Sequence, residues 1–185
     1  MAETPSNMLP LGTKAPDFQL LDTRTNQELT LDELKSNIAT VIMFICNHCP
    51  YVKHIQNMLT ETATSYQKKG ISFIAISSNN VETYPQDGPD EMKKEAERNH
   101  YTFPYLYDDT QEVAKAYQAA CTPDFYIFNK DLECVYRGRF DESTPGNNKP
   151  VTGKDLSDAL NAILAGKEVN ATQLPSHGCN IKWRR

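Results

Sequence analysis

The sequence predicts an α/β fold in one domain, and three observations support this class. A β-branched apolar run at residues 39–45, a stretch with helical periodicity and a second apolar run at 71–77 follow one another. This order is typical of a βαβ unit, in which a right-handed crossover joins two parallel strands. Two further strand patterns and a helical pattern follow within residues 124–164. The length of 185 residues suits one domain with additions.

The first half of the chain contains an N-terminal extension, residues 1–38, and the βαβ unit. In the extension we expect "APDFQLLD" at 15–22 to form a strand and "TLDELKSN" at 30–37 a short capped turn. The helix of the βαβ unit ends at residues 68–70, where two lysines precede a glycine. Its buried face carries apolar residues at three- and four-residue steps, namely Val52, Ile55, Leu59, Ala63 and Tyr66.

An inserted charged helix is expected at residues 90–99, after the polar stretch "SSNNVETYPQDGPD". Asp109 and Glu112 then have the spacing of a capping box, which predicts the start of another helix. The insert and this helix therefore separate the βαβ unit from the elements that follow it.

A β-hairpin and a last helix complete the predicted domain. Strands are expected at 124–129 and 132–139, joined by the tight turn "NKD". Thr152 and Asp155 have capping spacing ahead of the last helix, and Gly166 ends it. We expect one domain over residues 1–185, with its core at about 39–166 and a tail at 167–185.

Composition and charge exclude several classes of protein. The chain is 39% hydrophobic and 23% charged with a net charge of −5, and it has no apolar run long enough to cross a bilayer. Its N-terminus lacks the basic opening and apolar stretch of a signal peptide, so we expect a cytoplasmic protein with no membrane partner. The final "KWRR" is the one basic run, so we expect no nucleic-acid partner.

The motif "CNHC" at residues 46–49 is the strongest chemical signal. In a reducing compartment, cysteines serve in catalysis or metal binding more often than in structural bridges. Cys46 follows the first strand of the βαβ unit and precedes its helix, where unpaired N–H groups and the helix dipole stabilise a thiolate. Cys49 lies one helical turn further on.

Two motifs together resemble the thioredoxin fold. "CNHCPYV" with "CTPDFYIF" is similar to the AhpC/TSA-type redoxin branch over roughly residues 10–166, and the ending "GCNIKW" resembles a peroxiredoxin-like subgroup of thioredoxin family proteins. The resemblance implies a central mixed sheet flanked by helices, with an N-terminal extension, an inserted helix between the two halves and a C-terminal tail.

The resemblance also implies a thiol–disulfide oxidoreductase. In such an enzyme Cys46 attacks a disulfide and Cys49 then resolves the mixed disulfide. His48 occupies a position that carries histidine in disulfide isomerases, where it tunes the thiolate. Pro123 is expected to follow a cis peptide bond that presents the backbone of Thr122 to an extended substrate. The expected partners are proteins with disulfides or small thiol compounds, and an unidentified recycling reductant.

Three residues depart from the thioredoxin pattern. Ile45 stands where a tryptophan usually precedes the first cysteine, and Thr40 stands where thioredoxins bury a carboxylate. Pro50 biases Cys49 away from helical angles and has no N–H to donate. We therefore expect the second thiol to react more slowly than that of thioredoxin or to be posed differently.

A thiol peroxidase is the first alternative, with Cys46 or Cys49 attacking peroxide. Neither cysteine is preceded by the threonine and proline of peroxiredoxins, although Arg137 or Arg139 could supply a cation. In this alternative Cys179 is a candidate resolving cysteine, because the 13 residues after Gly166 can extend over about 40 Å. The competing interpretation is an idle Cys179 in a tail that Ile181 and Trp183 pin to the surface.

Metal handling is the second alternative, since Cys46, His48, Cys49 and His54 offer soft ligands for zinc or cuprous copper. A single cluster without a second pair is weak support, so we expect no resident metal and no cofactor. Of the other cysteines, Cys134 is expected in the core, and Cys121 at the rim of the site.

Overall fold

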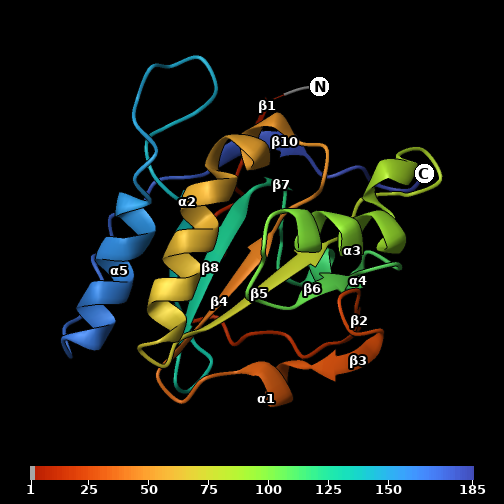
Figure 1. The fold of residues 1–185 in the computed structure, drawn as a ribbon. Coiled ribbons are helices and arrows are strands. Elements are labelled where there is room, and N and C mark those ends of the chain that lie inside the picture. Colours follow the sequence, from red (N-terminus) through yellow and green to blue (C-terminus); the bar gives the residue numbers. More distant parts are fainter. Residues whose placement is uncertain (1–2) are drawn as a thin grey trace.

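The computed structural model describes residues 3–185, which form a central mixed sheet with helices on both faces (Figure 1). Its strand order is β3-β2-β6-β5-β4-β8-β9. The strands β4, β5 and β6 run parallel, and the other neighbours pair antiparallel. The bounds are β2 (Gln19–Asp22), β3 (Gln27–Thr30), β4 (Ala39–Phe44), β5 (Ser72–Ser77), β6 (Tyr105–Tyr107), β8 (Asp124–Asn129) and β9 (Cys134–Gly138).

The predicted βαβ unit is confirmed. Helix α2 (Pro50–Gln67) connects β4 to β5, which pair in parallel from Thr40 opposite Ser72 onwards. Gly70 follows the helix with a φ of 90°, a conformation that glycine adopts readily. The predicted hairpin is present as β8 and β9, although β9 is shorter than expected.

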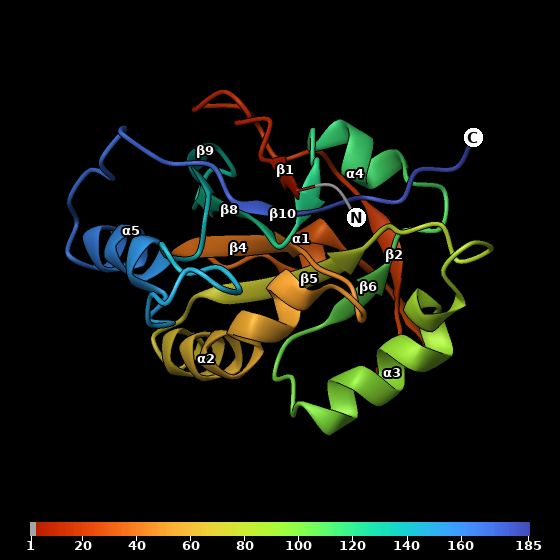
Figure 2. The same ribbon diagram turned by 90° about the horizontal axis from the view of Figure 1, so that it is seen from above.

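Helices α2, α3 (Pro89–Arg98) and α5 (Lys154–Leu164) cover one face of the sheet, and α1 (Leu31–Leu34) and α4 (Glu112–Ala116) lie against the other (Figure 2). The insert between β5 and α3 also contains a short 3-10 helix, η1 (Pro85–Asp87). The capped turn expected at 30–37 is α1, whose capping box joins Thr30 and Glu33.

Neither of the two predicted capping boxes forms. Before α4, the carboxylate of Asp108 rather than Asp109 accepts the free N–H groups of the first turn. Before α5, the Thr152 hydroxyl accepts the N–H of Lys154, but Asp155 pairs with Arg139 instead of completing a capping box. Asp141 accepts the N–H groups of Thr152 and Gly153, just ahead of the helix. Both helices begin after a residue in the left-handed region, so neither start has the geometry of a capping box.

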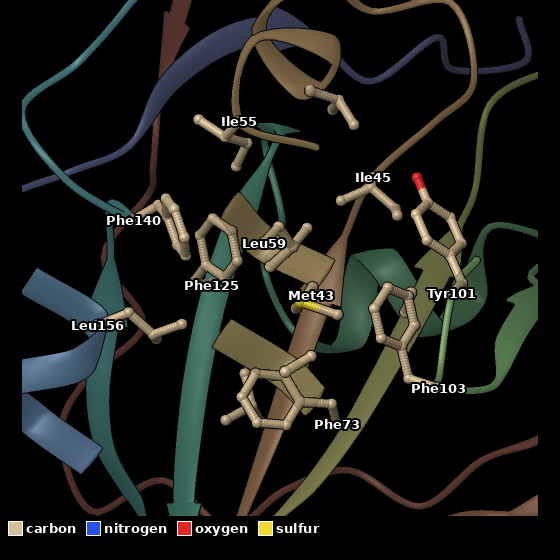
Figure 3. Packing of buried hydrophobic residues seen from close by; sticks show 14 of the residues in the cluster. Met43, Ile45, Ile55, Leu59, Phe73, Tyr101, Phe103, Phe125, Phe140 and Leu156 are labelled. Carbon is tan, nitrogen blue, oxygen red and sulfur yellow. The ribbon is translucent and has the colours of Figure 1, made fainter. Parts of the chain in front are cut away.

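The hydrophobic core lies in two layers because successive side chains of a strand point to opposite faces. On β4, Val41 and Met43 pack under α2 and α5, whereas Ile42 and Phe44 pack on the opposite side. Figure 3 shows Met43 beside Leu59 of α2 within the first layer. Each such side chain stabilises the fold by about 1.5–3 kcal/mol through burial. The end of β4 that leads into "CNHC" is therefore rigidly supported.

A second sheet joins the two ends of the chain to the site. Its order is β1-β10-β7, with β1 (Glu3–Pro5), β10 (His177–Asn180) and β7 (Cys121–Thr122) all paired antiparallel. Figure 1 shows β10 beside the first turn of α2. The tail thus contains a strand that the sequence did not predict. Within residues 3–185, no helix has the length and apolar character needed to traverse a bilayer.

Candidate active site

Cys49, rather than Cys46, lies at the start of helix α2. Its backbone is extended, with φ −70° and ψ 123°, and its carbonyl accepts the N–H groups of Val52 and Lys53. Pro50 causes this boundary because its ring disfavours helical angles at the preceding residue and suits the first helical position. The expectation that Cys46 lies at the helix start is therefore wrong, because Cys46 lies in the loop between Phe44 and the helix.

Three thiols meet beneath this loop. Cys49 Sγ lies 2.8 Å from Cys179 Sγ and 3.3 Å from the carbonyl oxygen of Thr122. Cys46 Sγ lies 3.7 Å from the hydroxyl of Thr122, and the peptide bond between Thr122 and Pro123 is cis, as the resemblance implies. The exposed fractions are 1% for Cys46, 0% for Cys49 and 3% for Cys179, so none of the three residues lies open to solvent.

The tail covers the backbone edge that the sequence assigns to substrate docking. In the second sheet, Cys179 of β10 pairs directly opposite Thr122. Gly178 permits this close approach, since a Cβ atom at residue 178 would lie 2.0 Å from the carbonyl oxygen of Thr122. The edge expected to receive an extended substrate is therefore occupied by the chain's own strand. Cys179, which sequence alone could place anywhere within reach of the tail, lies against the dithiol.

A buried carboxylate organises the loop around His48. Asp87, the last residue of η1, accepts a bond from His48 Nδ1 at 2.5 Å and one from the Asn79 amide at 2.9 Å. Its other oxygen accepts the backbone N–H of Asn47 at 2.9 Å. Burial opposes the charge of Asp87, but these bonds outweigh it and lower the pKa of the carboxyl group. Asp87 is the main site residue that the sequence did not reveal.

His48 is held in one orientation. Nδ1 donates to Asp87 and lies 3.9 Å from Cys46 Sγ. The ring stacks on Tyr84, with the ring centroids 5.2 Å apart. Nε2 of His48 is buried and has no hydrogen-bond partner among residues 3–185. The ring is therefore held by Asp87 and Tyr84 rather than free in solvent.

The pKa values of Cys46 and Cys49 are shifted in opposite directions. The Cys46 thiol donates to the Cys49 sulfur, and this bond, with further help from Cys179, Thr122 and the N–H of Val52, outweighs burial and lowers the pKa of Cys49 to about 5. The same bond, together with burial and the nearby charge of Asp87, raises the pKa of Cys46. The lower pKa is therefore that of Cys49, whereas the sequence suggested Cys46.

The remaining thiols stay protonated. Burial and the bond to Cys49 raise the pKa of Cys179 to about 12. Cys121 is buried beside Pro123, and desolvation raises its pKa too. Cys134 lies in the core layer on the opposite face of the sheet, as expected, with a pKa raised by burial to about 11.

The two arginines considered as a source of positive charge for a peroxidase bind other residues. Arg137 binds the carbonyl of Leu9 and the side chain of Gln173, and Arg139 pairs with Asp155, so both arginines have structural partners.

The potential metal ligands are Cys46, His48 and Asp87, whose donor atoms lie within 4.8 Å of one another, while His54 and Cys49 do not belong to the group. His48 and Asp87 already bind each other, and a structural zinc site needs four ligands. The donor set therefore fits a metal ion poorly.

A family model for AhpC/TSA proteins matches residues 11–137. The chain belongs to the AhpC/TSA family. Its fold is the thioredoxin-like α/β fold, with a mixed central sheet and added elements at both ends. No curated protein matches the sequence.

Solved structures extend the comparison. An uncharacterized conserved protein from Geobacillus kaustophilus is 57% identical with a TM-score of 0.98, covering 100% of this chain and 97% of its own. A hypothetical protein from Sinorhizobium meliloti is 45% identical with a TM-score of 0.95 and 98% coverage of both chains. A peroxidoxin from Mycobacterium tuberculosis is 18% identical with a TM-score of 0.63, covering 84% and 96%. Like a thiol-disulfide oxidoreductase domain at 16% identity, it shares the fold alone.

Proposed function

We propose that the chain is a thiol–disulfide oxidoreductase whose reactive dithiol is Cys46 and Cys49. The observation that carries the proposal is that both thiols are buried and in contact with Thr122, with the pKa of Cys49 lowered to about 5. The thiolate is the attacking form in disulfide exchange, so Cys49 is ready to react at neutral pH. Membership of the AhpC/TSA family supports the class of chemistry.

The proposed cycle assigns the first attack to Cys49 and the second to Cys46, the reverse of the order expected from sequence. The Cys49 thiolate attacks one sulfur of a disulfide, forms a mixed disulfide and releases the first thiolate. Cys46 then attacks Cys49 Sγ, which closes the Cys46–Cys49 bond and releases the second product, to which the proton of Cys46 passes. The substrate disulfide gains two electrons and the dithiol loses two, which a separate dithiol reductant must restore.

Two further residues contact the thiols and support the proposal. Thr122 touches both sulfurs, through its carbonyl oxygen and its hydroxyl, and so positions them relative to each other. His48, held by Asp87, lies beside Cys46, where it positions the thiol that closes the cycle. The substrates are proteins with disulfides or small disulfides. The burial of all three thiols favours small disulfides unless β10 moves.

The same burial favours a thiol peroxidase as the second candidate, because a peroxide is smaller than any disulfide substrate. The Cys49 thiolate would take one oxygen from the peroxide and become a sulfenic acid, while the rest of the peroxide leaves as an alcohol or water. A neighbouring thiol would then condense with the sulfenic acid, releasing water and forming a disulfide.

One preparation tested in two assays separates the candidates. Reduction of insulin by dithiothreitol and consumption of hydrogen peroxide are measured for the wild type, Cys46→Ser, Cys49→Ser and the matched control Cys134→Ala. We expect the wild type and the control to accelerate insulin reduction equally, and Cys49→Ser to lose the activity.

Faster peroxide consumption than disulfide exchange would select the peroxidase. Full activity of Cys49→Ser in both assays would overturn the site.

A further inference from the structure

The tail strand β10 is fixed on the dithiol by several independent contacts. It lies between β1 and β7, and its register places Cys179 opposite Thr122. The hydroxyl of Ser176, the residue before the strand, donates to the carbonyl of Pro123 at 2.5 Å. The backbone N–H of Ser176 in turn binds the hydroxyl of Ser6, which donates to Asp124. A segment that merely covered the surface would not need contacts to both sides of the Thr122–Pro123 bond.

The closeness of these backbones depends on Gly178. Any side chain there would meet the carbonyl group of Thr122, whose oxygen and carbon lie 2.0 and 2.7 Å from the position of a Cβ atom. Because β strands alternate their side chains, the neighbour Cys179 then points toward the helix start. Its sulfur lies 2.8 Å from Cys49 Sγ, within the range in which a small side-chain movement forms a bond.

Cys49 Sγ contacts Cys179 Sγ on one side and the carbonyl oxygen of Thr122 on the other. The hydroxyl of the same Thr122 contacts Cys46 Sγ, so the three thiols gather around one residue. Exchange requires the attacking sulfur to reach one of the two sulfurs of a disulfide. Cys179 Sγ lies 2.8 Å from Cys49 Sγ, the sulfur that it would attack in a Cys46–Cys49 disulfide. The strand therefore has the pose of a bound substrate, with backbone pairing along β7 and a cysteine against the reactive sulfur.

We propose that Cys179 is a third redox-active thiol and that β10 is an internal substrate of the dithiol. This inference rests on the proposed function. In the exchange, Cys179 attacks Cys49 Sγ of the Cys46–Cys49 disulfide. The Cys49–Cys179 bond forms as the Cys46–Cys49 bond breaks, the electron pair stays on Cys46, and the proton that Cys179 loses passes to Cys46. The step needs no external oxidant, because one disulfide replaces another.

The exchange has a consequence for partners. A protein disulfide that uses the Thr122 edge must first displace β10, and a Cys49–Cys179 bond would lock the strand in place. Formation of that bond closes the docking edge and leaves Cys46 as a free thiol. After a small dithiol has reduced this bond, a partner needs only to displace β10 in order to dock.

Disulfide mapping on the full chain tests the inference. Reduced protein is treated with a limiting amount of diamide, quenched with acid and N-ethylmaleimide, and digested for mass spectrometry. In Cys46→Ser we expect Cys49–Cys179 to be the dominant disulfide, and in Cys179→Ser only Cys46–Cys49. The wild type should contain both, whereas Cys121→Ser, which removes the other buried thiol near Pro123, should match the wild type.

The outcomes separate the two proposals. Cys46–Cys49 as the only disulfide of the wild type, together with no Cys49–Cys179 in Cys46→Ser, would overturn the role of Cys179 and leave the proposed function standing. Absence of Cys46–Cys49 in the wild type and in Cys179→Ser would instead refute the dithiol. The wild type, mapped across a series of glutathione ratios, gives the same answer if Cys46→Ser fails to fold.

Discussion

Removal of the Cys46 thiol should raise the pKa of Cys49, because that thiol is the largest single cause of the low value. The perturbation is Cys46→Ala in the reduced protein. A hydrogen bond to a charged group contributes about 1.5–3 kcal/mol. Since one pKa unit is 1.36 kcal/mol, the expected rise is about 1–2 units. At pH 5, where the wild type is about half ionised, the thiolate fraction should fall by roughly 5- to 50-fold.

The assay is the absorbance of the thiolate at 240 nm during a pH titration, together with the rate at which iodoacetamide alkylates the Cys49 peptide. The wild type should show a step near pH 5 that Cys49→Ala abolishes. Cys46→Ser keeps a hydroxyl donor and should shift the step less than Cys46→Ala does. Cys134→Ala is the control, since its own pKa of about 11 lies outside the titrated step.

Two results would refute the reasoning about these thiols. A step near pH 5 that survives in Cys49→Ala and disappears in Cys46→Ala would place the thiolate on Cys46. An unchanged step in Cys46→Ala would show that the helix terminus alone stabilises the charge.

Three further predictions concern the surroundings of the dithiol. Gly178→Ala should destabilise the protein by about 1–3 kcal/mol in urea and slow Cys49–Cys179 formation, because its Cβ would overlap the Thr122 carbonyl. Asp87→Asn should lower the free energy of unfolding by about 1–3 kcal/mol and lower the pKa of Cys46. It should also leave the tautomer of His48 no longer fixed, which 15N NMR can follow. The reduced wild type should gain stability over Cys49→Ala as pH rises from about 5 to 9, by at most about 1.4 kcal/mol per pH unit.

Each of these predictions has a matched comparison. His177→Ala changes an exposed residue of the same strand as Gly178, so equal destabilisation by both would remove the steric explanation. An Asp87→Asn protein with an unchanged histidine spectrum would show that the carboxylate does not hold the ring. The sign of the pH effect follows from a folded pKa below the unfolded one: the stabilisation is complete above about 9 and is lost as pH falls through about 5. A flat difference would contradict it.

The sequence predicted the parts of the fold that rest on local patterns. The apolar run at 39–45 and the helical spacing of apolar residues from Val52 onwards are both local patterns. They were therefore enough to predict β4 and α2. The predicted capping boxes failed because spacing cannot show which side chain reaches a helix start. At α4 the carboxylate is that of Asp108, one residue before the predicted Asp109, and at α5 the predicted Asp155 pairs with Arg139.

The candidate site shows the same limit at the level of chemistry. The sequence located the motif, and the resemblance implied the cis bond. The low pKa of Cys49 depends on Cys46 within the motif, and also on Cys179 and Thr122, which only folding brings close. Asp87 lies in an insert with no periodic pattern, 39 residues beyond His48, and its role appears only when η1 places it under the loop.

Cys179 has even less local signal, because "HGCN" is no strand pattern, and its pairing depends on an open edge at Thr122 and on the absence of a side chain at Gly178. The sequence feature that points to this arrangement is the glycine directly before Cys179. In a chain that also contains a dithiol, such a glycine allows the tail backbone to approach closely enough for thiol–disulfide exchange.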